Sequence, residues 1–148
     1  MDEIEQLLIL QDRDQKIMRM EEELSRVEPE KTALMAKSEE ANQHLQETRK
    51  QAQQIESQRK DLELEVESKQ TQIERYAAQQ LETRKNEEYQ ALAKEIETCK
   101  SEIVSLEDRE LELMEAADLK QGDIDAASTA AKEAKERREN TQKKENRT

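Results

Sequence analysis

His44 and Cys99 are the residues of this chain whose types could support nucleophilic catalysis, since the sequence contains one histidine and one cysteine. A cysteine nucleophile needs its base within hydrogen-bond reach. A single cysteine also excludes an internal disulfide framework and a multi-cysteine metal site. The acidic clusters at 21–23 and 107–112 lack the Asp, Asn and Gly spacing of a calcium loop, and a solvated helix face explains them better. The sequence therefore predicts no catalytic, metal or cofactor site.

The composition restricts the fold to a helical or a disordered chain. Of 148 residues, 42% are charged and 32% hydrophobic, and phenylalanine and tryptophan are absent, so the chain cannot fill a compact globular core. One glycine and one proline are too few for a turn-rich β architecture or a flexible linker. The periodicity of the apolar residues therefore decides between a coiled coil and disorder.

The apolar residues form two heptad stripes, which favours a coiled coil. Alternating steps of three and four residues from Leu10 to Tyr76 give twenty positions, of which fourteen are apolar. The same steps from Tyr89 to Ala134 give fourteen positions, of which twelve are apolar. Stripes of this length are typical of coiled-coil helices. Continuing the first stripe past Tyr76 meets only polar residues, so the stripes are out of phase and the phase jump lies at 77–88.

The charges around the phase jump predict a turn at residues 83–88. The cations at 84–85 suit the negative end of a helix macrodipole, and the acids at 87–88 suit the positive end of a following helix. Asn86 between them is a favoured N-cap residue. We therefore expect one helix to end near residue 83 and another to start near residue 87. One continuous helix with a skipped residue is the alternative.

The predicted fold is all-α, an elongated antiparallel coiled-coil helical hairpin in which facing residue numbers sum to about 165. Tyr76 then faces Tyr89, and Val66 faces Cys99. His44 faces about residue 121, which lies roughly 33 Å along the helix from Cys99. We therefore interpret Cys99 as a small core residue and His44 as a partly exposed surface residue.

Pro29 interrupts the pattern of the first helix. A proline inside a helix removes a backbone hydrogen bond and costs about 3 kcal/mol, so we expect a kink near Glu28 with Pro29 at the start of a new segment. The whole chain, 1–148, is predicted to be one coiled-coil domain with an N-terminal helical segment, a long helix, a return helix and a frayed tail, at 1–28, 29–83, 87–140 and 141–148 respectively.

The start of the first helix extends past the predicted end of the return helix. Residue 142 is expected opposite residue 23, so residues 4–20 have no facing helix. Contiguous exposed apolar surface usually marks an interaction site. Folding back at Pro29, pairing with a second chain and binding a separate partner are the three ways of covering it. The candidate partner-binding residues are Ile4, Leu7, Leu8, Leu10, Ile17 and Met20.

The segment NEEYQALAKEIE at 86–97, followed by SLEDRELELME at 105–115, resembles the coiled-coil half of bacterial zinc-ribbon proteins of the FlgZ type. Its hairpin turn and signature residues here are Asn86, Glu88, Tyr89 and Leu92. The resemblance implies an antiparallel helical hairpin followed by a four-cysteine zinc ribbon. With one cysteine in the chain, zinc is expected only if a C-terminal ribbon is missing from it.

The resemblance also implies a non-enzymatic adaptor whose partners are RpoN-type sigma factors or components of flagellar or type III secretion export. The formal net charge of −12 opposes generic binding to nucleic acid or to an anionic membrane surface. No apolar run approaches the roughly 18 residues of a membrane span, and the acidic start is no signal peptide. We expect a cytoplasmic bacterial adaptor that binds protein partners, itself, or both. A structural spacer or self-associating rod is the alternative.

Overall fold

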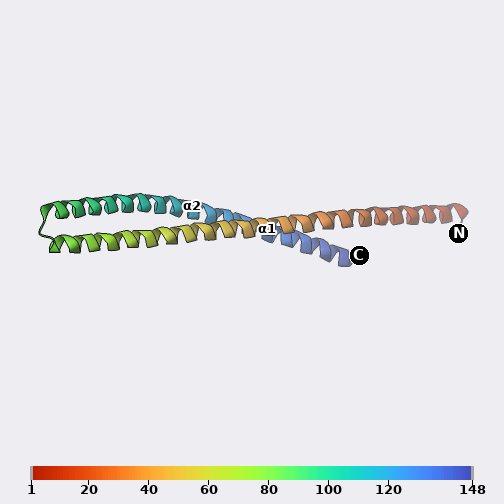
Figure 1. Ribbon diagram of the computed structural model, residues 1–148. Coiled ribbons are helices and arrows are strands. Elements are labelled where there is room, and N and C mark those ends of the chain that lie inside the picture. Colours follow the sequence, from red (N-terminus) through yellow and green to blue (C-terminus); the bar gives the residue numbers. More distant parts are fainter. Residues whose placement is uncertain (1, 148) are drawn as a thin grey trace. The chain divides into compact units, whose positions relative to one another are not determined.

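Two long helices joined by a short loop make up the chain. The structure is a computed structural model that describes residues 2–147. Helix α1 spans Glu3–Glu82 and helix α2 spans Asn86–Arg147, and the described residues contain no strand (Figure 1). The predicted all-α helical hairpin is therefore confirmed.

The hairpin consists of two compact units, which we describe separately. The turn unit comprises residues 47–125 and contains the loop, and the terminal unit comprises residues 2–46 and 126–147. Both α1 and α2 contribute to each unit. Within the turn unit, the two helices run side by side from the loop (Figure 1).

The loop comprises residues 83–85, so the predicted turn is confirmed with both helix ends one residue earlier than expected. The Thr83 hydroxyl donates a 2.8 Å hydrogen bond to the Glu88 carboxylate, and the Gln80 amide donates a 3.2 Å bond to the Tyr89 carbonyl. These contacts join the last turn of α1 to the first turn of α2. The alternative of one continuous helix with a skipped residue is excluded.

The predicted N-cap role of Asn86 is wrong by one position. The backbone N–H of Tyr89 donates to the carbonyl of Lys85 at 3.1 Å, which makes Lys85 the residue that accepts the first helical hydrogen bond of α2. Asn86 is the first helical residue. The acids at 87–88 do lie in the first turn of α2, where the macrodipole favours negative charge.

The helices are antiparallel, but the predicted register is wrong. Three contacts between α1 and α2 in the turn unit each join residues whose numbers sum to 171, in place of about 165. The prediction placed Tyr76 against Tyr89, whereas Tyr89 is 46% exposed. A sum of 171 centres the hairpin between residues 85 and 86, at the end of the three-residue loop. The three contacts are Cys99 Sγ to Gln72 Oε1 at 3.7 Å, Lys69 Nζ to Glu102 Oε2 at 2.6 Å, and Lys120 Nζ to Gln51 Oε1 at 2.5 Å.

The two apolar stripes supply the interface between the helices. Every stripe position of α1 from Val27 to Tyr76, and of α2 from Leu92 to Ala134, is buried or half-buried. Leu62 and Cys99 are the most buried apolar residues of the turn unit, at 8% and 4% exposed. In the terminal unit the buried side chains are small, namely Ser38, Ala127 and Ala131.

Helix α1 runs through Pro29, so residues 3–28 and 29–82 belong to one helix where two segments, 1–28 and 29–83, were predicted. Pro29 and Ser25 are exposed, and water can therefore satisfy the Ser25 carbonyl that loses its usual N–H donor. The kink remains a prediction. Helix α2 continues to Arg147, so residues 141–147 are helical where a frayed tail was expected.

Candidate partner-binding site

The two residues whose types could support catalysis lie in different environments. Cys99 is 4% exposed and its thiol contacts Gln72, which confirms its interpretation as a core residue. His44 lies on an exposed face of α1. Within residues 2–147, no three His, Cys, Asp or Glu side chains are grouped to hold a metal ion, and neither helix has an apolar stretch long enough to cross a membrane.

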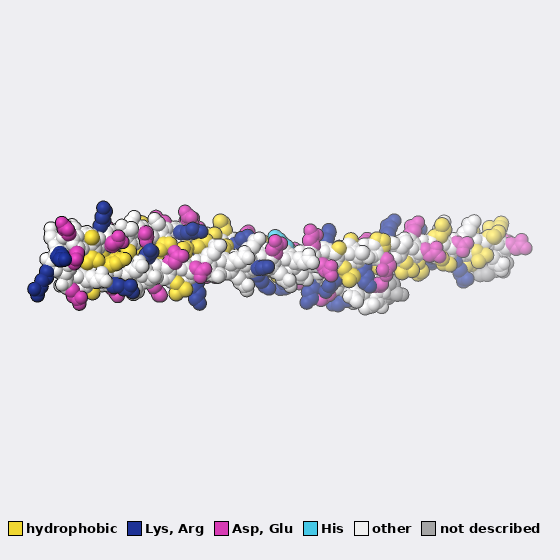
Figure 2. All heavy atoms as spheres, in the orientation of Figure 1, with side chains coloured by type: hydrophobic (Ala, Val, Ile, Leu, Met, Phe, Trp, Pro, Cys, Tyr) yellow, Lys and Arg dark blue, Asp and Glu magenta, His cyan; other side chains and the backbone are white. Residues whose placement is uncertain are grey.

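The exposed apolar side chains of the terminal unit are concentrated at the start of α1. We call residues 4–24 of α1 the open segment. It carries nine large aliphatic residues that are each between 42% and 64% exposed, and apolar side chains are visible along this end of α1 in Figure 2. The nine residues are Ile4, Leu7, Leu8, Ile9, Leu10, Ile17, Met18, Met20 and Leu24. They include all six predicted partner-binding residues.

The open segment is exposed because α2 accompanies α1 only on the C-terminal side of it. Lys31 Nζ lies 3.1 Å from Glu145 Oε2, so the last described turns of α2 lie beside Lys31. Within the terminal unit, the N-terminal end of α1 projects beyond the end of α2 (Figure 1). Because the Lys31–Glu145 pair sums to 176, the uncovered stretch is longer than predicted. It includes Leu24, which is 59% exposed.

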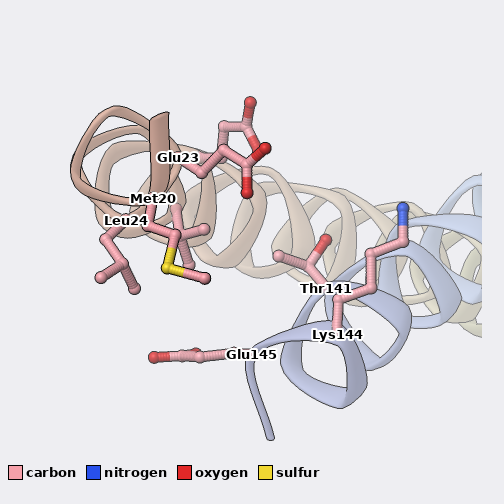
Figure 3. Close-up of a pocket in the computed structure, with 8 residues that line it drawn as sticks. Met20, Glu23, Leu24, Thr141, Lys144 and Glu145 are labelled. Carbon is pink, nitrogen blue, oxygen red and sulfur yellow. The ribbon is translucent and has the colours of Figure 1, made fainter. Parts of the chain in front are cut away.

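A groove of about 630 Å³ lies where the open segment meets the end of α2. Met20, Leu24 and Val27 of α1 form its apolar wall, and Thr141 and Glu145 of α2 form the opposite wall (Figure 3). Glu23, Glu30 and Lys144 complete the lining. At this groove the stripe of α1 changes from being covered by α2 to being exposed.

Acidic residues border the exposed stripe of Leu10, Ile17, Met20 and Leu24. In heptad terms, the six charged positions immediately beside this stripe are Asp14, Lys16, Glu21, Glu23, Glu28 and Glu30, of which five are acidic. The one basic member, Lys16, pairs with Asp12 at 3.4 Å. Residues 3–28 contain eight acidic and four basic residues, a net charge of −4. The site is therefore an apolar stripe between acidic borders.

The sequence prediction missed the α2 wall of the groove. The apolar stripe stops before residues 141–148, and on that basis the sequence predicts a frayed tail there. The heptad phase nevertheless continues from Ala134 through Arg138, Thr141 and Glu145, and all three later positions are half-buried. Continuing the heptad positions past Ala134, whether or not the residues there are apolar, would have identified Thr141 and Glu145 as residues that face α1.

The signature residues near the loop have structural contacts. Glu88 accepts the hydrogen bond from Thr83 and lies 3.9 Å from Lys85 Nζ, while the Tyr89 carbonyl accepts from Gln80. Leu92 is half-buried in the stripe of α2. These contacts hold the turn.

Comparisons of the chain with protein-family models, curated proteins and solved structures give no significant match.

Proposed function

We propose that this protein is a non-enzymatic, cytoplasmic coiled-coil adaptor that binds protein partners through the open segment of α1. The observation that carries the proposal is the set of nine large aliphatic residues, 42–64% exposed, on 21 consecutive residues of one helix. Burying such a side chain contributes about 1.5–3 kcal/mol, so their joint exposure favours a binding surface. Partners of the kind that the zinc-ribbon resemblance implies, an RpoN-type sigma factor or a secretion component, are the first candidates.

The test replaces Leu7, Leu8 and Leu10 together by serine. A matched control replaces Leu64, Leu111 and Leu119 by serine, because these leucines of the turn unit are 56–73% exposed and the chemical change is the same. Each variant is used as bait in a bacterial lysate, and its mass is measured by sedimentation equilibrium. Circular dichroism at 222 nm reports helicity.

The open-segment variant should retain most of its helicity and lose capture of the candidate partner, while the control variant keeps both. Equal capture by the two variants would place the binding surface elsewhere. If the unmodified chain binds no candidate partner and sediments as a monomer, the function as a structural spacer is favoured instead.

A further inference from the structure

We infer that the open segment binds an amphipathic α-helix whose apolar stripe is bordered by lysine or arginine. This inference rests on the proposed function and specifies the chemistry of the partner. Leu10, Ile17, Met20 and Leu24, with Arg13 at the position between Leu10 and Ile17, continue in the same heptad phase the stripe that α2 covers from Val27 onward. A surface that extends an established helix–helix interface in phase fits another helix.

The charges beside the stripe determine the kind of helix. Charged residues at these border positions govern the choice of partner in coiled coils, because they lie close to the border positions of the facing helix. Five of the six charged border positions from Asp14 to Glu30 are acidic, and the sixth, Lys16, already pairs with Asp12. Lysine or arginine on the facing helix would therefore form favourable pairs along both borders.

The groove at the end of α2 gives this partner a defined end position. Glu23 and Glu30, seven residues apart on the same border of the stripe, line this groove together with Met20, Leu24 and Val27 (Figure 3 shows Glu23 and the groove). A large apolar side chain near the end of the partner helix fits the apolar wall. A basic residue one turn away then lies near Glu23 or Glu30.

A second copy of the chain fits the same surface less well. Pairing two open segments brings a net charge of −3 beside another −3, and like charges across a helix–helix interface are unfavourable. An antiparallel pair also places the acidic residues 3 and 5 of one copy near the acidic groove of the other. Charge complementarity therefore favours a basic helix over self-association.

The experiment uses two synthetic 28-residue peptides with leucine at every heptad stripe position. The peptides carry lysine or glutamate, respectively, at all border positions, and binding to the full chain is measured by fluorescence anisotropy. A border variant combines Glu21→Gln, Glu23→Gln and Glu28→Gln. A control variant combines Glu63→Gln, Glu74→Gln and Glu107→Gln at exposed positions of the turn unit, so both variants lose the same total charge.

We expect the lysine peptide to bind the chain at least tenfold more tightly than the glutamate peptide, and to bind about tenfold less tightly when salt is raised from 50 to 300 mM. The border variant should bind the lysine peptide about tenfold less tightly than the control variant. The triple serine variant at Leu7, Leu8 and Leu10 should lose binding.

The failures of the two proposals are distinguishable. Equal binding of both peptides, still abolished by the serine substitutions, would overturn the basic partner and retain the open segment as a binding surface. Equal losses in the border and control variants would show attraction to total charge and also overturn the basic partner. Self-association of the chain that blocks peptide binding would identify a second copy as the occupant. Peptide binding unaffected by the serine substitutions would overturn both proposals.

Discussion

Replacing Ser38 by alanine should stabilise the terminal unit. Ser38 is 1% exposed, and its hydroxyl has no hydrogen-bond partner within the described residues. A buried, unsatisfied hydroxyl costs about 1–3 kcal/mol. Removing it takes that cost away without opening a large cavity, because alanine differs from serine by one oxygen atom. Alanine also has the higher helix propensity, which adds up to about 0.5 kcal/mol.

The substitution Ser68→Ala is the matched control, because Ser68 lies in α1 and is exposed. It carries the same gain in helix propensity without the burial effect. Urea unfolding followed at 222 nm should show Ser38→Ala more stable than Ser68→Ala by about 1 kcal/mol, which corresponds to roughly 2–4 °C in Tm. Equal effects of the two substitutions would show that the Ser38 hydroxyl is satisfied in solution, and the reasoning would fail.

The larger substitution Ser38→Leu tests the packing around the same site. Ala127 and Ala131 are 4% and 7% exposed, so this part of the interface is built from small side chains. Inserting a leucine should cost about 1–3 kcal/mol through overpacking. A stabilising effect of leucine would instead indicate free volume between the helices.

The register and one ion pair provide two further predictions. A cysteine introduced at Gln72 should form an intramolecular disulfide with Cys99, and one at Val66 should not, because position 66 lies about 9 Å further along α1. Mass spectrometry after mild oxidation would detect the disulfide. A disulfide formed only from position 66 would support the register predicted from the sequence. The hydrogen bond to Glu102 raises the pKa of Lys69 above 10.5. Its contribution to stability is therefore fully present below pH 10.5 and lost as the pH rises through the folded-state pKa. The difference in urea midpoint between the unmodified chain and the Glu102→Gln variant should be constant from pH 7 to 10 and should disappear above that range. A difference that stays the same at every pH would contradict the contribution of the Lys69–Glu102 pair to stability.

The heptad pattern predicted the contacting faces of both helices, because burial of a helix stripe depends on spacing alone. It could not predict the register, which depends on loop length and on individual polar contacts. Lys69 and Lys120 occupy stripe positions and were exceptions to the apolar pattern. In the structure they reach Glu102 and Gln51 of the other helix. Long basic side chains can place their charged ends outside an apolar interface, so polarity at a stripe position does not exclude a contact.

Pro29 shows where a local rule was overridden. An internal proline costs about 3 kcal/mol. That cost applies to one turn only, whereas α1 as a whole has 80 residues. The predicted binding residues depended on a simpler argument. Ile4, Leu7 and Leu10 are exposed because α2 does not accompany them, and the register error changed only how far the uncovered stretch extends.

The size of the side chains along the first stripe distinguishes the open segment from an unused helix end. In the terminal unit, Ser38 lies buried in the covered stripe and is small. In the open segment the stripe residues are large, including Leu10, Ile17 and Leu24. Near the loop, where the phase reaches Gln80 and Thr83, the stripe becomes polar and its side chains hydrogen-bond across the turn.

A helix face that remains in water gains nothing from large aliphatic residues, and polar residues there would avoid exposed apolar surface. Leucine and isoleucine at heptad spacing fill the space between helices whose axes lie farther apart than they do at a layer of small residues. The open segment therefore has the side chains of an interface wider than that at Ser38. A basic helix seated on it would continue the existing interface between α1 and α2 in phase.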